Sequence, residues 1–285
     1  MNIKIKEVAQ AVELMDKQLR TELLIKDNKI QQKKLWENTY IKHQIDKRNN
    51  GECFSVNDHI CAMVYSMLSS GVPWERVEKG IDNTTGKITS IDKIFHQYDL
   101  EYILKCTPER LNNEIKEIHC ASQYTLKQMH ALINTNIPKL IKLAKEYGSI
   151  DDFYSYIVND DNSKKTLVLV LSDKHSIYKY EQMGEALVAE YLKNVGYAIA
   201  KPDRHICKIL GSEILGCSKC KTVPVYEAFD IVAEIAQKMN RPVAEVDYIL
   251  WSYCAKGYGE ICTKNNPKCD KCVAKKLTKF LIIFS

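Results

Sequence analysis

An aspartate at the start of a predicted helix is the first residue that could carry chemistry. Asp203 follows Lys201 and Pro202 and precedes Arg204 and His205, so its carboxylate has basic neighbours on both sides. A carboxylate at a helix start is most simply an N-cap, which accepts hydrogen bonds from backbone N–H groups. Held beside a phosphate clamp, the same carboxylate can instead face the anomeric carbon of a sugar. Its neighbourhood in the chain therefore decides between a structural and a chemical role.

A glycine opens another predicted helix 19 residues before Asp203. Gly184 follows a turn after a helix that ends near Leu171–Ser172. The first N–H groups of the new helix lack partners and lie at the positive end of its dipole, which makes a site for a phosphate. A helical corner that contains glycine is usually only a corner. The combination of Gly184 with Asp203 and its basic neighbours favours a site for a sugar-phosphate chain.

Cysteines form the second set of residues with possible chemistry. The chain has 11 cysteines, and its start has no apolar stretch typical of a secretory signal, which argues against a disulfide scaffold. Four of them crowd into 19 residues, at Cys254, Cys262, Cys269 and Cys272. The surrounding segment 252–285 has seven lysines against two acidic residues. A basic patch beside a cysteine cluster is typical of a nucleic-acid surface, and a solvated lysine-rich end explains the charge equally well.

The elements that must position these residues are predicted to be helices. A capping box at Ser55–Asp58, the pair Thr107–Pro108 and Pro224 each mark the start of an apolar stripe at helical spacing, and 3–47 is an amphipathic stretch. Only 166–171 resembles a strand, and one strand makes no sheet. With 45% apolar and 27% charged residues and no long apolar run, disordered, fibrous and membrane-spanning classes are excluded. The sequence predicts an all-α, cytoplasmic protein without membrane contact.

Two segments of the sequence resemble the helix-hairpin-helix (HhH-GPD) DNA glycosylase superfamily, of which endonuclease III is the best-known member. One runs from the hairpin Gln182-Met183-Gly184 to Asp203. The other, 257–272, looks like the iron–sulfur loop of that family. The resemblance implies a two-lobed all-α fold. A helical barrel would span 56–181, and 1–55 would pack with 182–285 in the second lobe.

The resemblance also implies an activity and its residues. Such proteins flip a modified or damaged base out of the duplex and cleave its N-glycosidic bond, and their catalytic aspartate falls on Asp203. The expected partner is double-stranded DNA that contains a modified base, bound by a monomer in base excision repair or in defence against phage DNA. The DNA-binding residues would be Gln182, Met183, Gly184, Glu185, Lys201, Arg204 and His205.

The sequence departs from the family pattern at several positions. Gln182 occupies the place of the first hairpin glycine. Glu185 and Ala186 stand where bifunctional members carry the Schiff-base lysine, so we expect a monofunctional enzyme that stops at an abasic site. The fourth cysteine of the iron–sulfur loop would fall at Thr278. These departures keep open an alternative function, a non-catalytic DNA-binding protein with a degenerate active site.

The metal prediction leaves three alternatives. Cys254 could replace the missing ligand and complete a 4Fe–4S cluster with Cys262, Cys269 and Cys272, because such clusters take four thiolates. The second possibility is that the loop has lost its metal, with Cys254 a buried core residue. A structural zinc ion is the third possibility.

Overall fold

The computed structural model describes residues 2–158, 164–263 and 265–275. Its contacts divide the chain into two compact units. The contiguous unit comprises 38–197, and the discontinuous unit comprises 1–37 with 198–285. This division differs from the predicted boundaries, since 38–55 and 182–197 belong to the contiguous unit. The physical reason is packing, because the helices in these two segments pack against each other or against the central helix of that unit.

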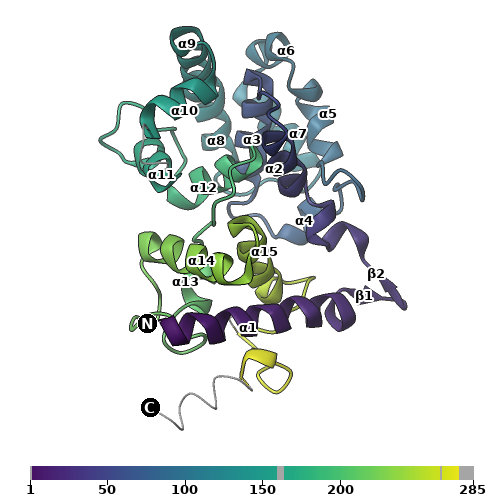
Figure 1. Cartoon of the computed structure of the whole chain (residues 1–285). Helices are drawn as coiled ribbons and strands as arrows, with labels where there is room; N and C mark the ends of the chain where they lie inside the picture. Colours follow the sequence, from purple (N-terminus) through teal and green to yellow (C-terminus); the bar gives the residue numbers. More distant parts are fainter. Residues whose placement is uncertain (1, 159–163, 264, 276–285) are drawn as a thin grey trace. The chain divides into compact units, whose positions relative to one another are not determined.

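The contiguous unit is a helical assembly around one buried helix (Figure 1). Its described elements are α2 (Tyr40–Asn49), α3 (Val56–Leu68), α4 (Trp74–Glu78), α5 (Thr89–Ile94), a 3-10 turn (His96–Tyr98), α6 (Leu100–Lys105), α7 (Pro108–Glu117), α8 (Thr125–Ala131), a π-helical turn η5 (Leu132–Asn136), α9 (Ile137–Tyr147), α10 (Ile150–Val158), α11 (Lys164–Ser172) and α12 (Glu185–Asn194). In α3 every residue from His59 to Leu68 is buried, so this helix forms the centre of the core. The predicted capping box of Ser55 and Asp58 is present, as are the Thr107 cap and Pro108 in the first turn of α7.

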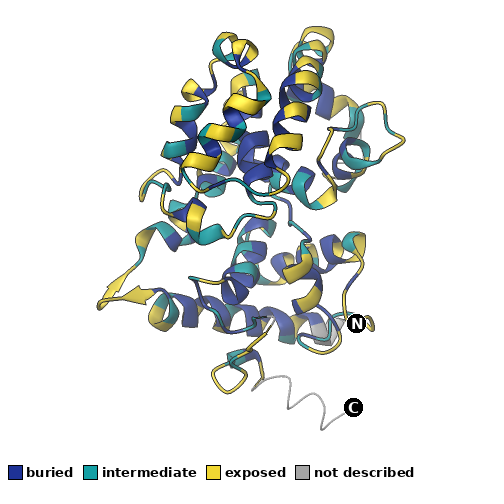
Figure 2. Cartoon of the chain, turned by 180° about the vertical axis from the view of Figure 1, so that it is seen from behind, coloured by how far each residue is buried: buried dark blue, intermediate teal, exposed yellow. Residues whose placement is uncertain are grey.

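The discontinuous unit joins the two ends of the chain. It contains α1 (Asn2–Gln18), a π-helical turn η1 (Leu19–Leu23), β1 (Ile25–Lys26), β2 (Lys29–Ile30), 3-10 turns at Gln32–Lys34 and Trp36–Asn38, the second of which runs across the unit boundary, α13 (Arg204–Ile209), α14 (Val225–Met239) and α15 (Val243–Cys254). The N-terminal helix α1 packs against both α14 and α15. Arg241, just before α15, forms ion pairs with Glu13 and Asp16 of α1 at 2.6 and 2.7 Å. Buried residues line the inner faces of these three helices (Figure 2).

The prediction of an all-α fold is confirmed for the described residues, with two local corrections. The segment 166–171 is part of α11 and not a strand. The amphipathic stretch 3–47 is interrupted by a two-stranded hairpin, β1–β2, because Asp27 and Asn28 both adopt left-handed backbone conformations and reverse the chain. No helix in the described part of the chain is long and apolar enough to cross a membrane.

Candidate active site

Asp203 is the N-cap of α13 in the discontinuous unit. Its Oδ1 accepts hydrogen bonds from the backbone N–H groups of His205 and Ile206, at 2.8 and 3.1 Å. Its Oδ2 accepts no hydrogen bond from the described residues. The side chain is half-buried, and Arg204 beside it is exposed. The N-cap role explains one carboxylate oxygen, and the second oxygen stays available for another task.

Buried contacts fix the backbone that leads into Asp203. The N–H of Lys201 donates to the carboxylate of Asp247 on α15 at 2.9 Å, and Asp247 is only 2% exposed. Pro202 is buried, and its carbonyl accepts a bond from the thiol of Cys207 at 3.4 Å. Sequence reasoning missed the role of Asp247, because an acid in a largely apolar helix has no local signature. The structure thus brings Lys201, Asp203 and the exposed side chains of Arg204 and His205 together on a rigid support.

The predicted helix–turn–helix is present in the contiguous unit as α11, a turn and α12. Gln182 has a left-handed backbone with φ of 59° and an exposed side chain. A glycine adopts this conformation at little cost, whereas other residues are strained in it by roughly 1–2 kcal/mol. The chain therefore keeps the backbone geometry expected of the first hairpin glycine although it carries glutamine there.

Gly184 is the N-cap of α12 and has no capping side chain. Its backbone is extended, with φ of −84°, so its conformation does not require glycine. A Cβ atom at this position would meet no other atom within 4 Å, so packing does not require glycine either. What the missing side chain does is leave the exposed helix start open to close approach by a ligand. Glu185, the first residue of α12, is also exposed.

Two polar side chains from η5 and α9 hold the backbone of the turn between α11 and α12 through hydrogen bonds. The buried amide of Asn136 on η5 makes two hydrogen bonds with the backbone of Glu181, donating to its carbonyl at 3.1 Å and accepting from its N–H at 2.8 Å. Lys139 donates to the carbonyls of Ile177 and Lys179. Sequence reasoning missed both residues, because their partners lie about 40 positions away. Met183 is 1% exposed and its N–H donates to Tyr180, which argues against its predicted role as a DNA contact.

A chain of buried hydroxyl groups links α12 to the core of the contiguous unit. The hydroxyl of Tyr154 lies 2.9 Å from that of Tyr180 and 2.6 Å from that of Tyr191, and the Tyr191 hydroxyl lies 2.6 Å from Nδ1 of His59. Burial lowers the pKa of His59 to about 4. The imidazole is therefore neutral at pH 7. The hydrogen bonds between these side chains hold α12 against α3 and α10.

Two of the four cysteines of the predicted metal site, Cys254 and Cys262, lie within hydrogen-bond distance of each other. Cys254 is buried at the end of α15, and a hydrogen bond with its thiol lowers the pKa of Cys262 to about 7. Cys272 is half-buried, and Cys269 is exposed. Among the described residues no group of three or more His, Cys, Asp or Glu side chains could hold a metal ion. Thr278 lies outside the described residues. The described thiols thus form no metal site as arranged, and the four-thiolate cluster stays a prediction.

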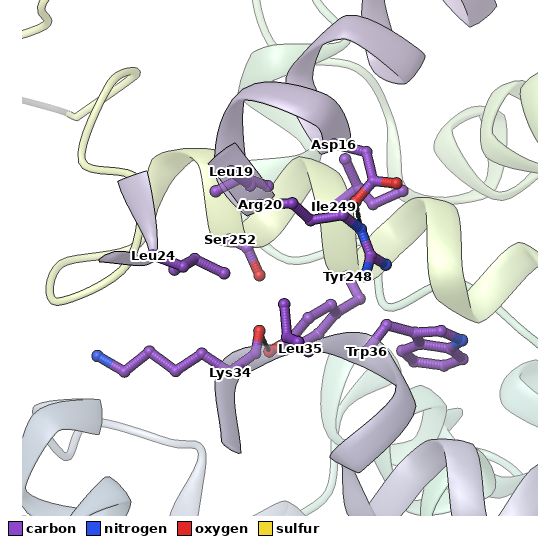
Figure 3. A pocket seen from close by; sticks show the side chains of 10 residues that line it. All are labelled: Asp16, Leu19, Arg20, Leu24, Lys34, Leu35, Trp36, Tyr248, Ile249 and Ser252. Carbon is purple, nitrogen blue, oxygen red and sulfur yellow. Dashed lines mark hydrogen bonds and ion pairs between the residues drawn. The ribbon is translucent and has the colours of Figure 1, made fainter. Parts of the chain in front are cut away.

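A pocket in the discontinuous unit is too small for a substrate (Figure 3). It lies between the segments around Arg20 and Leu35 and the helix α15, and the hydroxyl of Ser252 points into it. Its volume of about 10 Å³ is room for one water molecule at most. A base could not enter, so this pocket is separate from the chemistry of Asp203.

The chain is similar in fold to a solved structure. This is the 8-oxoguanine glycosylase/lyase of Methanocaldococcus jannaschii, in complex with a 15mer DNA containing 8-oxoguanine. The chain is 18% identical to it over 74% of its own length and 87% of the other, with a TM-score of 0.46. No protein-family model and no curated protein matches the sequence.

Proposed function

We propose that this protein is a DNA glycosylase that hydrolyses the N-glycosidic bond of a flipped-out modified or damaged base and leaves an abasic site. The observation that carries the proposal is the carboxylate of Asp203. One of its oxygens is fixed by two backbone N–H groups, and the other accepts no hydrogen bond from the described residues. A carboxylate held in this way is oriented before the substrate arrives, which is the condition for electrostatic catalysis.

The reaction needs a negative charge near the sugar. Glycosidic cleavage passes through an oxocarbenium-like transition state, in which positive charge develops on the sugar ring. Oδ2 of Asp203 would stabilise that charge more than it stabilises the neutral ground state. The same oxygen could orient or deprotonate the attacking water. The base must first leave the stack, and the cost of unstacking favours bases that are already poorly paired.

Exposed cations and backbone N–H groups would bind the phosphates. Arg204 and His205 are exposed beside Asp203, and Lys201 is half-exposed. In the hairpin, the exposed start of α12 offers N–H groups at Gly184 and Glu185, where the helix dipole favours an anion. The carboxylate of Glu185 would weaken this attraction, so its contribution is expected from the backbone.

The test is base release by the Asp203→Asn variant. Asparagine keeps the shape and the N-cap acceptor but loses the charge, so we expect duplex binding within about threefold of wild type and a fall in base release of several orders of magnitude. The substrates are duplexes that each carry one modified base, including bulky modified pyrimidines, and release is read as alkali-sensitive abasic sites. If the variant retains release within about tenfold, a loss of ~1.4 kcal/mol, Asp203 is only a cap.

Asp99→Asn is the matched control. Asp99 also caps a short helix, α6, through a hydrogen bond from the N–H of Tyr102 at 2.7 Å. The substitution should cost similar stability without affecting base release. Duplex binding without release of any base in the panel would favour the alternative function, a non-catalytic helix-hairpin-helix DNA-binding protein. The bases released would also separate a repair role from defence against phage DNA.

A further inference from the structure

The hairpin β1–β2 is a second exposed feature of the discontinuous unit. Its strands pair antiparallel, with Ile25 opposite Ile30 and Lys26 opposite Lys29. Asp27 and Asn28 form the two-residue turn, with φ of 51° and 57°, the geometry of a type I′ turn. All six residues are exposed, and the hairpin extends beyond the end of α1 (Figures 1 and 2).

The two faces of this hairpin have different character. Residues directly opposite each other in an antiparallel pair share a face, so the isoleucines lie on one face and the lysines on the other. The isoleucine pair stabilises the hairpin through cross-strand packing. The lysine pair does the opposite, because like charges directly opposite each other repel. Neither Lys26 nor Lys29 has an ion-pair partner among the described residues. The lysine pair therefore adds no stability to the protein by itself.

The local charge around the hairpin is positive. The acidic residue of the hairpin is Asp27, at its tip. The left-handed turn explains its presence there, because aspartate and asparagine tolerate that conformation. Glu22 accepts a hydrogen bond from Gln18, and Glu37 is paired with Arg20. The discontinuous unit as a whole has 22 lysine and arginine residues against 15 aspartate and glutamate residues, whereas the contiguous unit has 19 against 21. A polyanion is the ligand that this unit would attract.

We propose that the lysine face of β1–β2 is a second DNA-binding element, in which Lys26 and Lys29 contact phosphates of a duplex. The proposal rests on the proposed function in that DNA is the expected polyanion. Two cations fixed side by side by backbone pairing would replace their mutual repulsion with two phosphate contacts. A two-stranded ribbon also has the dimensions that a DNA groove admits. The contact would be independent of sequence, because phosphates carry no base identity.

The experiment measures binding of the full chain to a 20-base-pair duplex without any modified base, by fluorescence anisotropy over a range of salt concentrations. The double variant Lys26→Gln/Lys29→Gln is compared with Lys105→Gln/Lys116→Gln, which removes two exposed lysines from the ends of α6 and α7 in the contiguous unit. Both variants change the net charge equally. The hairpin variant should bind on the order of tenfold more weakly near 0.1 M salt, and the slope of log K against log salt should fall by about two. The control should stay within about twofold of wild type.

A third variant gives a gain that misfolding cannot mimic. Asp27→Asn keeps a residue suited to the left-handed turn and removes the acid at the tip, so binding should tighten by a factor of roughly three.

Equal affinity and equal salt dependence for wild type and the hairpin variant would overturn the proposal, and so would equal losses of affinity in both double variants. Competition by poly-glutamate as effective as by duplex DNA would also overturn it, in favour of an acidic protein partner. Base release by wild type is measured in parallel, so failure of the proposed function is seen separately from failure of the hairpin contact.

Discussion

Gln182 adopts a left-handed backbone conformation, which is unfavourable for a residue with a side chain. The two hydrogen bonds between the Asn136 amide and the Glu181 backbone hold the neighbouring peptide groups, so the turn keeps its geometry despite the strain. The glutamine at this position therefore does not disrupt the turn between α11 and α12. Because glycine would adopt this conformation with less strain, the stability of the fold does not explain why glutamine occupies this exposed position.

Gln182→Gly should raise the free energy of unfolding by up to about 1.5 kcal/mol. Relief of left-handed strain contributes roughly 1–2 kcal/mol, and the greater freedom of glycine in the unfolded chain offsets roughly 0.5–1 kcal/mol of it. Urea unfolding followed by circular dichroism measures the difference. Asn240→Gly is the control, because Asn240 is also left-handed, with φ of 52°, but asparagine tolerates that region and should gain less. A destabilised Gln182→Gly protein would contradict the strain argument.

Cys269→Ser tests the arrangement of the thiols. Cys269 is exposed, so its replacement should change the free energy of unfolding by less than about 0.5 kcal/mol. The measurement is made on anaerobically purified protein, together with its iron content and visible absorption. A large loss of stability, accompanied by loss of bound iron, would show that the loop rearranges around a 4Fe–4S cluster that contains Cys269.

At the scale of elements, the sequence predicted the features that depend on residues close together in the chain, such as helix caps. The caps at Ser55, Thr107 and Asp203 act within three residues of themselves, so their types and spacing suffice. The supports of the candidate site have distant partners, as with Asn136 and Glu181 or Asp247 and Lys201. A single polar residue in an apolar helix does not reveal which backbone group it will meet. The N-cap position of Asp203 was therefore predictable, and the supports of the candidate site were not.

For the proposed glycosylase activity, the start of α12 predicts whether the DNA strand is cut. Strand cleavage by a glycosylase needs an amine that forms a Schiff base with the opened sugar. The first turn of α12 contains no lysine, and Lys193 at its other end is 4% exposed and lies 3.4 Å from Glu190. We expect an intact strand with an abasic site that breaks only in alkali. Borohydride trapping measures this, and a stoichiometric covalent adduct that disappears on mutation of one lysine would show that an amine outside the first turn of α12 attacks the sugar.

At the scale of the whole molecule, charge is distributed unevenly between the two units. The sequence indicated the basic segment 252–285, but the discontinuous unit gathers further lysines from the N-terminal end of the chain. The sequence could not indicate this sum, because membership of a unit depends on contacts between segments far apart in the chain. For the same reason the predicted boundaries at 55 and 181 differ from the observed division.

Acid should destabilise the protein through His59. The pKa of this buried imidazole is lowered to about 4 from an ordinary value of 6.5, so the unfolded chain takes up the proton first as the pH falls. The contribution of the neutral imidazole is complete above pH 6.5 and is lost as the pH falls toward 4, a loss of about 3 kcal/mol at most. His59→Gln can keep a hydrogen bond to Tyr191 but cannot titrate. Its unfolding free energy, measured between pH 7 and pH 4, should fall less steeply than that of wild type, and parallel curves would contradict the prediction.

The discontinuous unit also sets an order of events during synthesis. The apolar face of α1, with Val8, Val12 and Met15, is covered by α14 and α15, and α14 begins at Val225, more than 200 residues after α1 ends. At about 5–20 residues per second, a ribosome needs roughly 10–40 s to make the intervening chain. The contiguous unit can fold within that interval, because all of its residues emerge before residue 198. Helix α1 is thus made long before the helices that bury it, and its apolar face is exposed to chaperones in the meantime.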